Sequence, residues 1–511
     1  FYFFILNCDI MDALIELVKI VNKKRLSKID VFDKTFINQD FNNLYYKLYD
    51  GLESGRITND ITAAKFIYGS NEKDAKFRKL KSRFKSKILK TILLFDVDEL
   101  FNYELGKAYY ECITHSHIIE ILVKLTGTST LVVELIKENY TKAQKYQFYD
   151  ILKSYSYLLM TYYALKGNKK LFTIEEEYFN EYSEMLKNEQ IAKNLYNKGI
   201  VEIVSASSIN QELLDKIHAI VEELNTVRLK VENPEIQFFY FYVSLLYHEY
   251  KNDLKGILKL CDATEALLDE YIQVSSNNRR VILLVYRLRS NLQLGNYEVA
   301  LQMLETNLAI LPERNKYNWY IVKEIEFKIY LRDHKIQEAY HVYEEVIANP
   351  TFKRQTDELT ERWKIYQAYL IFMDNYLNKG EYKFSLGRFM NDVPVNSKDK
   401  SGFNFAIRII SILFQAARDD FSYIFSNMEA LRVYRSRYLN DNTYKRNHLF
   451  LSAMMKAEKS GFNAKTMLQS DWQELDELRR PNANIIADWE IIPYHQLWDI
   501  FVSLCKLHKI T

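Results

Sequence analysis

The scarcity of glycine and proline is the feature that most constrains the fold of this chain. The sequence contains 13 Gly and 6 Pro in 511 residues, whereas average proteins have roughly 12% of the two together. Every Pro lies after position 233. Chains built from β-strands need many tight turns, and those turns rely on Gly and Pro. Long helices joined by short loops need few of either, so we predict an all-α protein.

The composition narrows the class further. Hydrophobic residues make up 48% of the chain, with 39 Tyr and 30 Phe, which is enough apolar surface to form a core. The formal net charge is +2, so any preference for nucleic acid or membrane must be local. No run of 18 apolar residues predicts a membrane-spanning helix. The four cysteines form no CxxC pair, which favours a reduced, cytoplasmic protein.

Four regions can be separated along the chain. Met11 begins a good helical pattern, so we expect residues 1–10 to be an upstream extension; the alternative is a truncated signal or anchor. The expected regions are 1–10, an N-terminal helical region at 11–144, helical repeats at 145–395 and a C-terminal helical or capping region at 396–511. The periodicity predicts helices near 40–53, 60–68, 72–96, 98–112, 114–125, 130–138, 403–417, 419–439, 443–459 and 464–480.

The clearest repeated unit covers residues 281–312, where two helical stretches flank a short turn. Gly295 suits a left-handed turn between the helices, and Ala300 allows their axes to approach closely. Tyr297 and Leu304 are expected to fill the groove beside Ala300. The unit therefore predicts a helical hairpin.

This unit resembles the tetratricopeptide repeat. Pro312 matches the Pro that ends the second helix in that family, whereas Asn307 stands where the family prefers a small residue. In a second, similar unit His334 replaces the turn Gly. The small positions of four such units are Gly256, Ala300, Ala339 and Ser385. Their spacings of 44, 39 and 46 residues exceed the 34 of the family. The resemblance implies an α-solenoid of degenerate hairpins; the alternative is an irregular helical bundle.

A basic amphipathic helix is predicted over residues 73–90. Phe77, Leu80, Phe84 and Ile88 recur at helical spacing and predict an apolar face. The candidate polyanion-binding residues are Lys76, Lys79, Lys81, Arg83, Lys85 and Lys87. They suit contacts with nucleic-acid phosphates or, alternatively, docking to an anionic membrane. A solvated or internally paired helix face is the simplest interpretation.

No sequence motif indicates catalysis. The chain has no GxSxG, P-loop, GxGxxG or HExxH pattern, and phosphate-binding loops need glycines that it lacks. Cys112, His115 and His117 are metal-capable, but no second half-site appears at zinc spacing. The Arg and Tyr residues of 432–438 could stack bases, although half-buried Tyr beside solvated Arg is the plainer interpretation. We therefore expect no enzyme, no metal and no cofactor.

We expect a non-catalytic scaffold or adaptor that binds a protein or peptide partner. The resemblance implies that the partner lies on the concave face formed by the first helices of the hairpins. In the best unit the groove candidates are Leu284, Leu288 and Asn291. The alternative function is a nucleic-acid-associated factor that uses the helix at 73–90. An enzyme without a recognisable motif is the third hypothesis.

Overall fold

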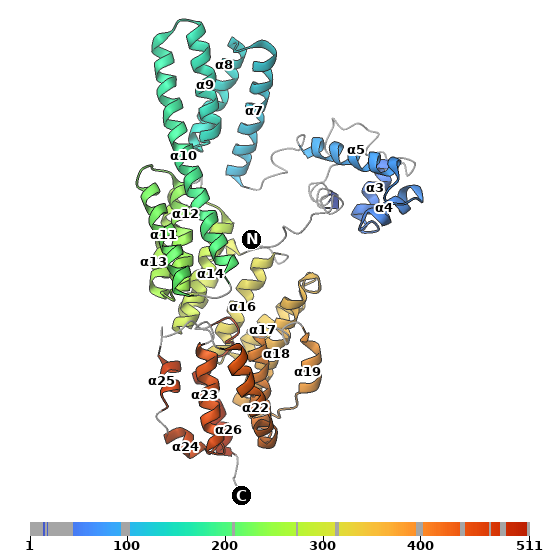
Figure 1. The fold of residues 1–511 in the computed structure, drawn as a ribbon, viewed down its shortest axis with the longest axis vertical. Helices are drawn as coiled ribbons and strands as arrows, with labels where there is room; N and C mark the ends of the chain where they lie inside the picture. Colours follow the sequence, from blue (N-terminus) through green and yellow to red (C-terminus); the bar gives the residue numbers. More distant parts are fainter. Residues whose placement is uncertain are drawn as a thin grey trace. The chain divides into compact units, whose positions relative to one another are not determined.

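The computed structural model describes residues 14, 15, 18, 44–92, 103–206, 210–271, 274–311, 316–394, 402–439, 445–469, 472–480 and 487–507. All regular secondary structure in these ranges is helical, which confirms the predicted all-α class (Figure 1). No described helix combines the length and the apolar character needed to cross a membrane. The expectations for residues 1–10 and for Pro312 fall outside the described residues.

The chain forms two compact units, residues 1–183 and 184–511. The helices of the first unit, including a long one that continues into the second, are α3 (Leu44–Glu53), α4 (Asp60–Tyr68), α5 (Ala75–Ile92), α7 (Glu104–Thr126), α8 (Thr130–Lys145), α9 (Tyr149–Leu165) and α10 (Lys169–Ser205). One core joins α3, α4 and α5, and another joins α7, α8, α9 and the start of α10. Asn59 caps α4 and forms a capping box with Thr62, which satisfies backbone N–H groups at the helix start.

The second unit continues as a series of helices, most of which pack on the next helix along the chain. They are α11 (Gln211–Arg228), α12 (Pro234–Tyr250), α13 (Leu254–Glu270), α14 (Asn277–Leu294), α15 (Tyr297–Thr306), α16 (Tyr317–Arg332), α17 (Ile336–Ile347), α18 (Asp357–Asn378), α19 (Leu386–Asp392), α21 (Phe403–Ala417), α22 (Phe421–Tyr438), α23 (Lys445–Lys459), α24 (Ala464–Gln469), α25 (Gln473–Arg479) and α26 (Tyr494–Leu507). Two 3₁₀ turns, Leu308–Ile310 and Phe352–Arg354, follow α15 and α17.

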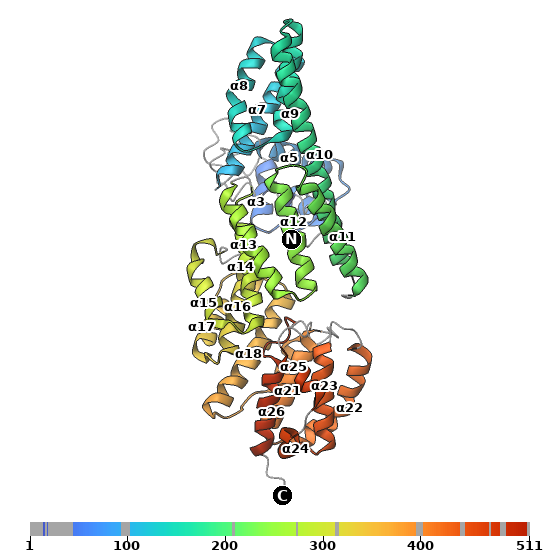
Figure 2. The same ribbon diagram turned by 90° about the vertical axis from the view of Figure 1, so that its left-hand side faces the viewer.

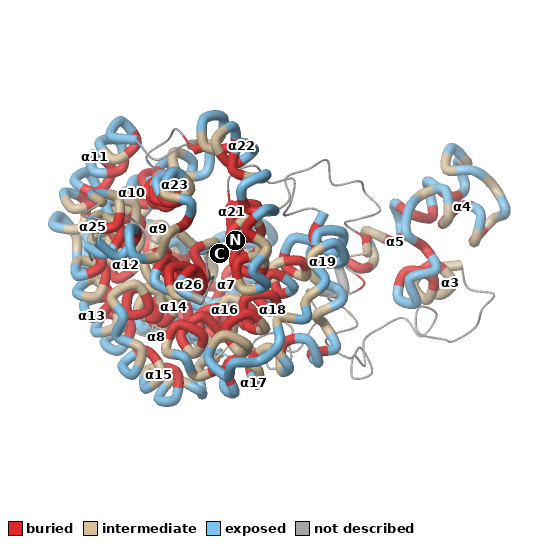
Figure 3. Tube along the Cα trace, turned by 90° about the horizontal axis from the view of Figure 1, so that it is seen from below, coloured by how far each residue is buried: buried red, intermediate tan, exposed pale blue. Residues whose placement is uncertain are grey.

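The C-terminal helices of this unit share one large core. Figure 2 shows α21, α22, α23 and α26 gathered side by side, and contacts join α21 to α22 and α26, and α23 to α22 and α26. Helix α21 is buried along most of its length (Figure 3). Eleven of its fifteen residues are apolar, and the four polar residues, Asn404, Arg408, Ser411 and Gln415, lie on one narrow face, so most of its surface is available for burial.

Several predicted boundaries differ from the structure. The expected helices at 98–112 and 114–125 are a single helix, α7, because Thr114 and Ser116 do not interrupt its backbone. The expected helix at 464–480 is two short helices, α24 and α25. The compact units divide at 183/184 inside α10, and Tyr182 packs into the same core as α7, α8 and α9.

The same short turn joins six pairs of consecutive helices in the described part of the chain. In each, one residue with positive φ follows the first helix, and the next residue donates its N–H to the carbonyl five positions earlier at 2.8–3.0 Å. The second helix starts at the residue after that. This bond pattern is a Schellman motif. The residues with positive φ are Gln147, Gly167, Asn252, Gly295, His334 and Asp419.

The hairpin predicted at Gly295 has the expected local geometry. Gly295 adopts a left-handed conformation with φ of 77°, which glycine reaches without steric cost. Ala300 and Leu304 are buried in a core shared by α14, α15 and α16, and Tyr297 packs against it. The second predicted hairpin is equivalent, since His334 occupies its turn with φ of 61° and Ala339 is buried.

The two weaker units are placed differently from the prediction. Ser385 is the N-cap of α19 and does not lie inside a second helix. The segment before it is held instead by Arg418, which donates to the carbonyls of Tyr382 and Phe384. In the other unit the turn residue is Asn252, so Ile257 corresponds to Ala300 and the predicted Gly256 is one position early.

Candidate functional site

The basic helix predicted at 73–90 is α5, which forms one side of the α3–α5 bundle. Phe77, Leu80, Phe84 and Ile88 are buried against α3 and α4, as its periodicity predicted. This packing turns most of the basic side chains toward solvent. The exposed basic residues of α5 and of the turn before it are Lys73, Lys76, Arg78, Lys79 and Arg83.

Three of the six predicted polyanion-binding residues on α5 are less available. Lys81 is buried, and its Nζ lies 2.6 and 2.7 Å from the two carboxylate oxygens of Asp60 at the start of α4. Its charge is therefore already paired, and the assignment of Lys81 to polyanion binding is corrected. Lys85 and Lys87 are half-buried, and Lys87 lies 4.8 Å from the ring of Tyr45. The remaining exposed charges are Lys76, Lys79 and Arg83.

The predicted groove residues of α14 lie in the interior. Leu284 and Leu288 are buried in the core shared with α15 and α16. Asn291 is also buried, and its Nδ2 donates to the carbonyl of Arg287 at 2.9 Å while its Oδ1 accepts from Asn296 at 3.2 Å. All three side chains stabilise the hairpin, and none is presented to a partner at the surface. We therefore withdraw the assignment of these residues to a binding groove.

An apolar stripe lies exposed on α7. Cys112 and Ile119 face the core formed with α8 and α9. Ile118, Ile121 and Leu125 follow one another at helical spacing on the opposite face, with exposed fractions of 47, 60 and 75%. Single exposed apolar residues are ordinary, whereas an apolar stripe at helical spacing is a candidate surface for a protein contact. Periodicity analysis missed it because α7 is apolar on both faces.

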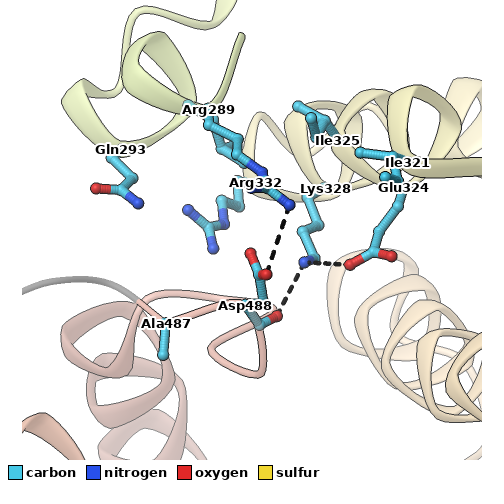
Figure 4. Close-up of a pocket in the computed structure, with 10 residues that line it drawn as sticks. Arg289, Gln293, Ile321, Glu324, Ile325, Lys328, Arg332, Ala487 and Asp488 are labelled. Atoms are coloured by element: carbon cyan, nitrogen blue, oxygen red, sulfur yellow. Dashed lines mark hydrogen bonds and ion pairs between the residues drawn. The ribbon is translucent and has the colours of Figure 1, made fainter. Parts of the chain in front are cut away.

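A cluster of charged side chains lies within the second unit (Figure 4). Lys328 donates to the Glu324 carboxylate at 2.8 Å and to the backbone carbonyl of Asp488 at 2.9 Å. Arg289 Nη2 lies 3.7 Å from Asp488 Oδ2, and Arg362 Nη1 lies 3.3 Å from Glu324 Oε2. The cluster thus links α14, α16 and α18 to the segment that precedes α26.

The charges of this cluster keep Glu324 ionised. Burial of the carboxyl acts to raise its pKa, but Lys328 and Arg362 outweigh burial and hold the pKa below its usual value. Tyr366, itself buried, donates its hydroxyl to the same carboxylate at 2.5 Å. Every oxygen of Glu324 therefore has a partner, so this carboxylate suits a structural role and not proton transfer.

A cavity of about 260 Å³ lies beside this cluster within the same unit. Four arginines and one histidine line it together with apolar residues of α13, α14, α15 and α25, and no carboxylate does so among the described residues. The basic lining residues are Arg332, Arg446, Arg479, Arg480 and His495. Arg332 and Arg446 are buried whereas Arg479 and Arg480 are exposed, so the cavity extends from the surface into the interior.

Three lining residues of this cavity, Arg332, His495 and Gln496, have a buried polar atom without a hydrogen-bond partner among the described residues; the atom of Gln496 is the acceptor Oε1. Arg332 donates from Nε to the carbonyl of Ile491 at 2.9 Å and from Nη2 to that of Glu490, but its Nη1 has no hydrogen-bond partner among the described residues. His495 Nδ1 is likewise buried without a partner there. Burial and the nearby Arg446 hold the pKa of His495 below its usual value.

The other residues noted in the sequence are dispersed or already paired. Cys112 is buried while His115 and His117 are exposed, and no three potential metal ligands gather among the residues that the structure describes. In the 432–438 segment Tyr434 is buried, and Arg432 pairs with Glu429 and Glu458.

The cavity and the ionic cluster could not be found from sequence spacing. Arg289, Arg332, Arg446 and Asp488 lie far apart in the chain, and only the pair Glu324–Lys328 has the i, i+4 spacing that signals an ion pair on one helix. Comparisons with known proteins offer no further guide, since no protein-family model, curated protein or solved structure matches the chain.

Proposed function

We propose that this chain is a degenerate tetratricopeptide-like helical-repeat protein that acts as a non-catalytic scaffold for a protein or peptide partner in the cytoplasm. The observation that carries the proposal is the exposed apolar stripe Ile118, Ile121 and Leu125 on α7. When a partner removes an apolar side chain from water, the free energy falls by about 25 cal/mol for each Å² that is buried. A helix in the partner could pack along this stripe.

The recurrent helical turn supports the repeat part of the proposal. Repeated helical hairpins are expected to share one connection geometry. Six connections share a residue with positive φ at the same position and the same backbone hydrogen bond after it. Sequential packing of α11 on α12, α12 on α13 and α13 on α14 is also what stacked hairpins produce. The free thiols of Cys112, Cys261 and Cys505 suit a reducing compartment.

The scaffold proposal is tested with the double variant Ile121→Glu/Leu125→Glu. Affinity capture from a native extract, read by mass spectrometry with and without nuclease, should show specific proteins that the wild type retains after nuclease and that the variant loses. Leu229→Glu is the matched control, because Leu229 ends α11 and is 74% exposed, as Leu125 is near the end of α7. Equal capture by wild type and variant, or equal loss in the control, would contradict the proposal.

A nucleic-acid-associated function is the second candidate. It rests on three exposed basic residues of α5, Lys76, Lys79 and Arg83. None of them forms an ion pair with a described acidic side chain. Each phosphate contact releases a counterion, so binding of a duplex oligonucleotide should weaken steeply with salt. The variant Lys76→Gln/Lys79→Gln/Arg83→Gln should abolish that binding. Removal of three exposed lysines from α10, in Lys169→Gln/Lys193→Gln/Lys198→Gln, should leave it unchanged.

A further inference from the structure

The arginines that line the cavity of the second unit are only partly paired with carboxylates. Glu490 pairs with Arg446, and Asp499 pairs with Arg479 at 3.1 Å. Arg480 has no such partner among the described residues. Arg332, which is only 3% exposed, donates to backbone carbonyls and forms no ion pair with a described carboxylate.

A buried guanidinium that forms no direct ion pair is costly to hold in the folded state. Removing a cation from water costs several kcal/mol, and only a nearby negative charge with good hydrogen-bond geometry compensates for it. Arginine keeps its proton even when burial lowers its pKa, as it does for Arg332. Arg332 Nη1 therefore remains a charged donor without an acceptor, on the wall of a cavity that other arginines share. An anion that enters the cavity would supply an acceptor near this guanidinium.

The chemistry of the lining also indicates what kind of anion fits. Guanidinium groups from α16, α23 and the end of α25 surround the cavity, and an oxyanion with several acceptor oxygens and more than one negative charge satisfies more of them than a carboxylate can. The lining residues contributed by α13, α14 and α15 are largely apolar, including Leu254, Leu292 and Tyr297. An anion that also carries an apolar group would fill both parts.

We propose that this cavity binds a small organic phosphate, with its phosphate group at Arg332 and Arg480 and its apolar group against Leu292 and Tyr297. The site lies in residues 252–496, apart from the α7 stripe and from α5. The phosphate-binding proposal can therefore be tested independently of the scaffold proposal. Binding would stabilise the second unit, because a ligand that binds only the folded state shifts the unfolding equilibrium.

Isothermal titration calorimetry of the full chain with phenyl phosphate, inorganic phosphate and benzyl alcohol tests the site. Phenyl phosphate should bind at one site per chain, inorganic phosphate more weakly, and benzyl alcohol not measurably. Arg480→Gln, an exposed change that should not disturb folding, should weaken phenyl phosphate binding about tenfold. Arg332→Lys keeps the charge but loses the planar donor geometry, and should weaken it as well.

Two controls separate this site from general attraction of anions. Arg388→Gln removes an arginine of the same unit whose side chain is 85% exposed and lies outside the cavity, and it should leave binding unchanged. The α5 variant Lys76→Gln/Lys79→Gln/Arg83→Gln should also bind normally. The proposal is overturned if phenyl phosphate does not bind the wild type, or if binding is unaffected by both Arg480→Gln and Arg332→Lys. Equal weakening in the Arg388→Gln control would overturn it too.

Discussion

Arg446 and Glu490 form a two-bonded ion pair in the interior of the C-terminal helices. Arg446 Nε lies 2.7 Å from Glu490 Oε2, and Arg446 Nη2 lies 2.7 Å from Glu490 Oε1. Both side chains are buried, and the same carboxylate accepts the backbone N–H of Tyr494 at 2.7 Å. The Glu490 carboxylate therefore joins α23 to the start of α26, through the ion pair with Arg446 and the hydrogen bond from the Tyr494 N–H.

Breaking this pair on one side should be strongly destabilising. Glu490→Gln leaves the Arg446 guanidinium buried without its counter-charge, which costs about 3–5 kcal/mol in comparable pairs. Denaturant unfolding followed by circular dichroism measures the change. Glu212→Ala removes an exposed pair with Lys216 and should cost much less, because solvent screens the interaction. A similar cost for the two substitutions would contradict the structural role of the buried pair.

Lys81 should contribute to the stability of the α3–α5 bundle, unlike its exposed neighbours. Lys81→Gln removes a charged donor from Asp60 and should destabilise the bundle by about 1.5–3 kcal/mol. Lys79→Gln, an exposed change on the same helix, should have almost no effect. Hydrogen exchange of the α4 and α5 amides reports this local stability directly. Unchanged protection in Lys81→Gln would show that the bond to Asp60 is unimportant.

The left-handed turns predict opposite effects for two substitutions. Gly295→Ala places a Cβ at φ of 77°, where a non-glycine residue loses about 1–2 kcal/mol. His334→Gly relieves the corresponding strain at φ of 61°, offset by about 0.5–1 kcal/mol of added chain entropy in the unfolded state. The first should lower the melting temperature, and the second should leave it unchanged or raise it slightly.

Gly387→Ala provides the matched control for the turn at Gly295. Gly387 lies in α19 with φ in the ordinary range and with open space where a Cβ would be. Alanine there should stabilise the helix by up to about 1 kcal/mol. If Gly295→Ala were as harmless as Gly387→Ala in thermal unfolding, the left-handed turn would not be needed at that hairpin.

His495 should make the protein less stable as the pH falls. Burial and the adjacent Arg446 lower its pKa in the folded state, whereas the unfolded side chain titrates near about 6.5. The unfolded state therefore binds more protons below about pH 6.5, and the free energy of unfolding decreases with decreasing pH. His495→Gln should flatten this slope between about pH 7.5 and 5.5.

His448 is the control for this pH dependence. Its pKa is also lowered, by burial and by Arg435, so His448→Gln should remove part of the same slope and leave the contribution of His495. Denaturant titrations at a series of pH values measure both. A slope identical in wild type and His495→Gln would show that this histidine does not couple to folding.

The described cysteines should resist alkylation until the protein unfolds. Cys112, Cys261 and Cys505 are buried, and burial raises their pKa values to about 11, 12 and 12. The thiolate is the reactive form, so little of it exists at neutral pH. Peptide-resolved mass spectrometry after iodoacetamide treatment should find these three unmodified in the native protein and modified in denaturant. Rapid native labelling would contradict their burial.

Some features of this protein follow directly from local sequence. The near absence of Gly and Pro is enough to predict an all-α chain, because backbone turns depend on those two residues more than on tertiary contacts. The spacing of Phe77, Leu80, Phe84 and Ile88 likewise predicts the buried face of α5. Gly295 and Ala300 reveal one hairpin, since a left-handed turn and a close helix approach each select a particular small residue.

Other turns and sites were decided by tertiary structure. Asn252, His334 and Asp419 occupy the same left-handed turn as Gly295; these residue types adopt positive φ more readily than most but also occur widely elsewhere, so their identity alone does not predict the turn. The burial of Lys81, Leu284 and Leu288 reversed their predicted roles. Helical periodicity shows which residues share a face of one helix, but it does not show which face another helix covers.

The ionic cluster and the arginine-lined cavity depend most on the tertiary fold. Arg332 lies in α16, Arg446 in α23 and Arg480 directly after α25, and their proximity arises only when these segments pack in one unit. The sequence by itself therefore determined the helical class and parts of individual hairpins, which arise from interactions within a turn or two of chain. The tertiary structure decided which charged groups are buried, because burial depends on neighbours that are distant in sequence.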